Sequence, residues 1–257
     1  MARSVTFHFV PPAYEPDIGA LVYGMTYQDR LYLPYRNFFN NSDWPSIDES
    51  QVCPVIALST EFQEFFVRVW DTATPSKRYR ASFMLASTIV HEVAHAYYHH
   101  ARPWHSDDEL EPYHTLEDSK PELGFSWEKW AFGVLINPCN HSITNIGALA
   151  SCSEVRFQPG EETRSSECKE FPGVTFLPSQ NWKGDQWSTV DFNRENRTRL
   201  VFRAVPMRWV HEWFDKRCWA DAETSEEYAP NPLGPTLMLN FEKANGRLRC
   251  FYGVDAG

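Results

Sequence analysis

The chain has 257 residues, of which 42% are hydrophobic and 15% aromatic. This length and composition allow a sizeable buried core and exclude an intrinsically disordered protein. The formal net charge of −10 argues against general binding to nucleic acid or to an anionic membrane, because both need a basic surface.

The first residues, MARSVTFHFVPPAYEP, contain no apolar run long enough for a signal peptide. No stretch of about eighteen apolar residues occurs, so we expect no membrane span. We therefore expect a cytoplasmic protein. The six cysteines are widely spaced and include no C-x-x-C pair, so reduced thiols are expected. The sequence carries no signal for an oligomeric state.

In chain order, the first predicted elements are strands and a short helix. Four segments rich in Val, Phe, Tyr, Leu or Ile predict strands: 4–10, 20–25, 30–34 and 55–58. Thr60 and Gln63 then form a capping-box pattern, which predicts a helix that continues to about Trp70.

A long helix is predicted next, in the segment that carries the most informative motif of the chain. Pro75 and Ser76 mark its start, and Pro103 lies just beyond its end. Residues 77–101 include no Gly or Pro. Their apolar side chains are distributed nearly all round a helix, which is typical of a buried central helix.

The remaining segments predict a second helix followed by strands. An acidic connection over 105–122 leads to a helix from about Pro121 through Leu135, which Asn137-Pro138 is expected to end. Residues 139–190 predict an irregular insertion of loops and short strands. The last elements are a strand at 198–205, a helix from Pro206, and a hairpin over 237–254 around Asn245-Gly246. Without a clear boundary, we expect one α+β domain over 1–257.

The motif is His91-Glu92-Val93-Ala94-His95, which reads H-E-x-x-H. Residues four apart lie on one face of a helix, so the two imidazoles can converge on one metal ion. Glu92 borders the same face, where it can reach a metal-bound water. The motif also occurs by chance, and the alternative is a pair of hydrogen-bonded core histidines.

A catalytic zinc usually has three protein ligands and one water, so a third ligand is needed. Glu122 heads the second predicted helix, and Gly124 would let the two helices approach closely. A carboxylate there also has an interpretation without a metal, as a favourable charge in the first turn of a helix. His99 extends the row of histidines, but one ion cannot bind all three along about 12 Å of helix. Other candidates remain open: Glu128 as a ligand or as a partner of one, and His105, His114 or an Asp as ligands.

With a Glu-bearing helix downstream, the segment from Ser76 to Gly133 resembles the gluzincin type of zincin metallopeptidase. The resemblance rests on five motif positions and is loose elsewhere. It implies a small twisted mixed sheet packed on the metal-binding helix. It also implies zinc bound by His91, His95 and Glu122, with Glu92 as the general base. The segments IVHEVAHAYY, ELGFSWEKWAFG and VPMRWVHEWF are also similar to uncharacterised fungal H-E-x-x-H proteins.

The function expected from these residues is zinc-dependent hydrolysis of an amide bond in a peptide or a small molecule. Two alternatives remain: an enzyme of this fold that forms or cleaves an amide in a small molecule or a (cyclo)dipeptide, and a non-catalytic binding protein. A cationic or phenolic donor normally assists the reacting carbonyl. The candidates for this role are His141, His211, Tyr228 and Arg203.

Overall fold

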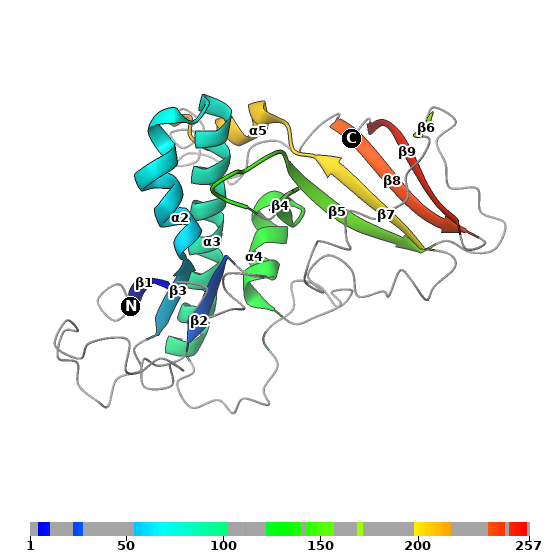
Figure 1. Ribbon diagram of the computed structural model, residues 1–257. Helices are drawn as coiled ribbons and strands as arrows, with labels where there is room; N and C mark the ends of the chain where they lie inside the picture. The colour runs from blue at the N-terminus through cyan, green and yellow to red at the C-terminus, as the bar shows by residue number, and fades with distance from the viewer. Residues whose placement is uncertain are drawn as a thin grey trace. The chain divides into compact units, whose positions relative to one another are not determined.

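Figure 1 shows a computed structural model of the chain. It describes residues 5–10, 23–27, 54–101, 111, 122–139, 142–156, 169–171, 198–216, 236–244 and 247–255. The chain divides into two compact units: unit 1 comprises Met1–Ala73 and Met84–Trp130, and unit 2 comprises Thr74–Phe83 and Ala131–Gly257. Helices α3 (Pro75–Ala101) and α4 (Leu123–Phe132) contribute residues to both units.

Unit 1 contains a three-stranded mixed sheet with the order β1-β3-β2. Its strands are β1 (Thr6–Val10), β2 (Gly24–Tyr27) and β3 (Val55–Ser59). β3 is the central strand and is buried throughout, parallel to β1 and antiparallel to β2. Helices and sheets are thus both present, as the α+β expectation requires. The strand expected at 20–25 overlaps β2 at Gly24 and Met25, its first residues lie outside the described residues, and so does the strand expected at 30–34.

The sheet of unit 1 packs on one face of α3 (Figure 1). Ile56 and Leu58 of β3 contact Ala96, and the rest of the contact face follows helical spacing: Leu85, Ile89 and Val93. The expectation that α3 is buried nearly all round is wrong, because Val90 is 38% and Tyr97 60% exposed. A small sheet covers only one face, and apolar composition alone does not show which faces a helix buries.

The short helix α2 (Thr60–Glu64) begins one residue earlier than the capping-box pattern predicts. The side chain of Ser59, rather than Thr60, accepts a hydrogen bond from the backbone of Glu61 at 3.3 Å. The helix continues as a π-helical turn over Phe65–Val69 and a 3₁₀ turn over Trp70–Thr72, so it extends about as far as predicted.

Unit 2 contains a six-stranded sheet with the order β4-β5-β7-β8-β9-β6, in which every pair is antiparallel. Its strands are β4 (Ile136–Pro138), β5 (Leu149–Arg156), β6 (Lys169–Phe171), β7 (Thr198–Ala204), β8 (Thr236–Ala244) and β9 (Arg247–Asp255). β8 and β9 form the predicted hairpin, with Asn245-Gly246 between them. Asn137-Pro138 was expected to end α4, but these two residues belong to β4. The helix ends at Phe132, followed by Gly133 with a φ of 73°.

An aromatic cluster packs in unit 2 around helix α5 (Met207–Glu212). Trp209 lies against both Phe83 and Phe132, at centroid distances of 5.6 and 5.8 Å. Trp213 stacks edge-on against Phe132 at 5.1 Å. Trp209 and Val210 are buried, so the helix predicted from Pro206 contributes to a packed core.

Three remaining expectations concern the whole chain. β5 and β6 show that the range 139–190 contributes strands to the sheet, while the single domain over 1–257 stays a prediction. Cys250, buried in β9, is a free thiol, as expected for it. In the part of the chain that the structure describes, no helix combines the length and the apolar character that crossing a bilayer requires.

Candidate metal centre

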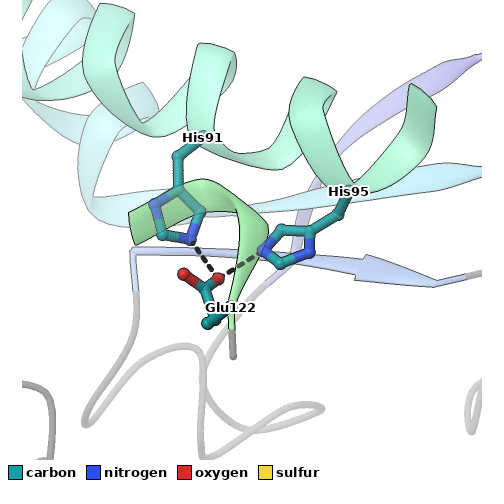
Figure 2. Close-up of side chains that lie close together, drawn as sticks. All are labelled: His91, His95 and Glu122. Atoms are coloured by element: carbon teal, nitrogen blue, oxygen red, sulfur yellow. Dashed lines mark hydrogen bonds and ion pairs between the residues drawn. The ribbon is translucent and has the colours of Figure 1, made fainter. Parts of the chain in front are cut away.

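Two histidines on α3 and one glutamate at the start of α4 point toward a common centre (Figure 2). Nε2 of His91 lies 3.0 Å from Oε1 of Glu122, and Nε2 of His95 contacts the same oxygen. The ligand atoms of the three residues all lie within 4.8 Å of one another. His91, His95 and Glu122, the three ligands expected from the sequence, are therefore a group that could hold a metal ion.

The carboxylate of Glu122 is oriented by the first turn of α4. Its Oε2 accepts a hydrogen bond from the backbone of Phe125. The backbone oxygen of Glu122 accepts hydrogen bonds from the backbone N–H and the hydroxyl of Ser126, at 3.0 and 2.9 Å. One carboxylate oxygen thus caps the helix while the other faces the imidazoles. The interpretation of Glu122 as a charge at the helix start is therefore compatible with its interpretation as a metal ligand.

Gly124 allows α4 to approach the imidazole of His91 directly. A Cβ atom at this position would lie 2.3 Å from both Cδ2 and Nε2 of His91, far inside van der Waals contact. The ring of Phe125 meets the same imidazole edge-on at a centroid distance of 5.1 Å. Only glycine at this position leaves room for the imidazole as it lies.

Each histidine also has an outer carboxylate partner on its second ring nitrogen. Nδ1 of His91 lies 2.8 Å from Glu128, and Nδ1 of His95 lies 2.8 Å from Glu111. The other oxygen of Glu111 accepts a bond from the backbone of Leu123 at 2.9 Å. Such partners fix the tautomer with the proton on Nδ1 and leave Nε2 for a metal. Glu128 is thus a partner of a candidate ligand rather than a member of the group.

The carboxylates make the centre favourable for positive charge. Burial acts to lower the pKa of His91, but Glu122 and Glu128 outweigh it and raise the pKa well above its ordinary value. For His95, burial is likewise outweighed, by Glu111 and Glu122, which raise the pKa to about 9. Burial opposes ionisation of Glu122, but the two imidazoles lower its pKa. A divalent cation supplies positive charge in the same place.

Glu92 lies beside the group but does not belong to it. The residue is only 4% exposed, and its Oε2 accepts a hydrogen bond of 2.8 Å from the hydroxyl of Thr26. Burial raises the pKa of Glu92, against the opposing charges of His91 and His95. A raised pKa suits a carboxylate that must take a proton from water near neutral pH.

Sequence reasoning missed two of these partners, Glu111 and Thr26. Glu111 stands in an acidic run, HSDDELEPYH, in which nothing distinguishes one carboxylate from the next. Thr26 is an ordinary strand residue in a segment remote from the motif. Of the other candidates, His211 and Arg203 lie in unit 2, where the ring of His211 packs against Tyr79. His105, His114, His141 and Tyr228 lie outside the described residues.

No protein-family model, no curated protein and no solved structure matches this chain. The likeness to gluzincins therefore rests on the motif residues alone. What the chain does must be inferred from the chemistry of this site.

The histidine pair predicts that His91→Ala and His95→Ala will each lose the metal, because two donors bind far more weakly than three. Wild-type protein should contain close to one metal ion per chain by elemental analysis. His100→Ala is the matched control, since this exposed histidine lies on the same helix outside the group. Full metal retention in both test variants would rule the site out.

Gly124→Ala should abolish metal binding, because the new methyl group occupies the position of the His91 ring. Gly133→Ala is the control: no atom lies within 4 Å of its added Cβ, but its positive φ adds strain. We expect it to cost about 1 kcal/mol of stability while metal affinity stays unchanged. Titration calorimetry and thermal melts measure both quantities, and equal metal affinities in the two variants would contradict the packing argument.

The third ligand is tested by carboxylate substitutions. Glu122→Ala should lower metal affinity most and Glu122→Gln less. Glu128→Ala and Glu111→Ala should cost about 10- to 100-fold, as removal of a ligand's partner usually does. His105→Ala and His114→Ala should bind metal nearly as wild type. A strong loss in either of these two instead would identify a three-histidine site and remove the gluzincin resemblance.

Proposed function

We propose that the chain is a zinc-dependent hydrolase that cleaves amide bonds in peptides or small amides. The observation that carries the proposal is the group of two imidazole nitrogens and one carboxylate oxygen beside a buried second carboxylate, Glu92. Two histidines and a glutamate, with one position left for water, are a recurrent ligand set of catalytic zinc. The two histidines fit this use, because Glu128 and Glu111 bind their Nδ1 atoms and leave the Nε2 atoms for the metal.

Zinc is preferred to calcium or magnesium because of the donor types. Calcium and magnesium bind oxygen ligands, and calcium takes six to eight of them. A set with two imidazoles instead suits zinc and its transition-metal neighbours. Among these, zinc adds Lewis acidity without redox chemistry, which is what hydrolysis needs.

Each residue of the site has a separate role in the proposed reaction. When bound, zinc would polarise the amide carbonyl and lower the pKa of water to about 7. Glu92 takes the proton of the attacking water and then delivers it to the leaving amine. Glu111 and Glu128 fix the imidazole rings, and Glu122 supplies the anionic ligand.

The arrangement of unit 1 supports a gluzincin-like fold within this proposal. A small mixed sheet packs on the helix that carries the histidines, and the third ligand precedes the following helix. β2, an edge strand of that sheet, lies against α3 at Glu92. These features support the proposal of a gluzincin-like fold.

Glu92→Gln should retain the metal and the fold but lose turnover by about 10²- to 10⁴-fold, the usual contribution of a general base. Hydrolysis is measured on peptide libraries and on small amides by mass spectrometry, with metal content determined on the same samples. Glu64→Gln, an exposed carboxylate on α2, is the control and should turn over as wild type.

The outcomes separate the classes of function. Cleavage of peptides identifies a peptidase, and cleavage or formation of small amides alone identifies a small-molecule enzyme. Turnover by Glu92→Gln equal to wild type would show that the general base is wrong. A wild-type protein that binds metal but turns over neither class would be a binding protein.

A further inference from the structure

A hydroxyl on strand β2 forms a hydrogen bond with the proposed general base. Oγ1 of Thr26 lies 2.8 Å from Oε2 of Glu92 and 2.9 Å from the backbone oxygen of the same residue. A threonine hydroxyl has one proton, so it donates to one of these acceptors at a time. Both acceptors belong to Glu92, so this one hydroxyl joins β2 to the side chain and to the backbone of a residue 66 positions later in the chain.

A glycine on the same strand makes this contact possible. A Cβ atom on Gly24 would lie 2.8 Å from Cγ of Glu92, 2.9 Å from its Oε1 and 2.8 Å from Cγ2 of Thr88. Each distance is shorter than real Cβ contacts allow, so β2 and α3 are as close here as a glycine permits. The carboxylate thus has the backbone of Gly24 against Oε1 and the hydroxyl of Thr26 on Oε2.

This geometry restricts a side chain that otherwise has three rotatable bonds. A glutamate general base must keep one oxygen aimed at the attacking water, and small displacements are costly to the rate. A hydrogen bond from a neutral hydroxyl to an ionised carboxylate is stronger than one between two neutral groups. The pair Gly24 and Thr26 is therefore suited to fix which way the Glu92 carboxylate points.

We infer that Thr26 is a positioning residue that orients Glu92 for proton transfer, and that Gly24 sets the approach of β2 that makes this contact. The inference rests on the proposed amide hydrolysis. Thr26 acts through Glu92 rather than on the substrate, so its loss should lower kcat and leave KM nearly unchanged.

The first experiment compares two substitutions that differ in one hydroxyl. Thr26→Val keeps the shape and strand propensity but removes the donor, and should lower kcat of the zinc-loaded protein by about 10- to 100-fold. Thr26→Ser keeps the donor and should recover most of kcat. Ser87→Ala is the control, because it removes a buried hydroxyl on α3 that bonds the backbone of Met84. Its kcat should equal wild type. Equal kcat in the Val and Ser variants would overturn the inference.

The second experiment does not depend on activity. Urea unfolding of wild type, Thr26→Val, Glu92→Met and the double variant forms a double-mutant cycle. If the hydroxyl contacts the carboxylate, the effect of Thr26→Val on the unfolding midpoint should be much smaller in the Glu92→Met background. Equal effects in both backgrounds would mean that the hydroxyl serves only the backbone oxygen, and the inference fails.

The two experiments distinguish failure of this inference from failure of the proposed function. If wild type hydrolyses no amide, the proposed function fails, and the unfolding cycle alone decides whether Thr26 restrains Glu92. If wild type is active and the cycle shows coupling, Gly24→Ala should lower kcat as Thr26→Val does. A Gly24→Ala protein with wild-type kcat would overturn the role given to Gly24.

Discussion

The packing of the α4 backbone on the imidazole of His91 is the contact on which the rest of the site depends. Because Gly124 has no side chain, the first turn of α4 reaches the ring itself. That approach brings Glu122 to Nε2 and Glu128 to Nδ1 of one histidine. A second glycine, Gly24, permits a close approach of β2 to α3 at Glu92, where a Cβ atom would lie 2.8 Å from Cγ of Glu92. The backbones of α4 and β2 thus both pack directly on α3, and both contacts lie at the H-E-x-x-H motif.

The four carboxylates around the two imidazoles have different environments and therefore different uses. Glu122 shares one oxygen between both rings, which keeps it ionised despite its burial. Glu111 and Glu128 each bond an Nδ1 atom on the outer side of a ring. Glu92 is the most buried and contacts a hydroxyl, so desolvation dominates and raises its pKa. Environment rather than residue type separates the candidate ligand, its two carboxylate partners on the histidines and the candidate base.

Local sequence signals predicted much of the fold and the inner part of the site. The helical spacing of the motif, the helix start near Glu122 and the small residue Gly124 are all local, and each is realised in the structure. The strand order of unit 2 depends on pairing between distant segments, which periodicity does not encode. Thr26 was missed because it lies 66 residues from Glu92 in the chain, and Glu111 because it is one of several carboxylates in an acidic run.

The contact between Gly124 and His91 has a consequence for how sequences related to this one would diverge. A side chain at position 124 would occupy the space of the His91 ring, so the residue at each position limits the size of the residue at the other. A descendant that loses the imidazole gains room for a side chain on α4, whereas a descendant that keeps it cannot. In an alignment of homologues, positions 91 and 124 should therefore covary, with glycine replaced only where histidine has already gone. Degenerate, metal-free descendants would be recognisable by that pair before any ligand is inspected.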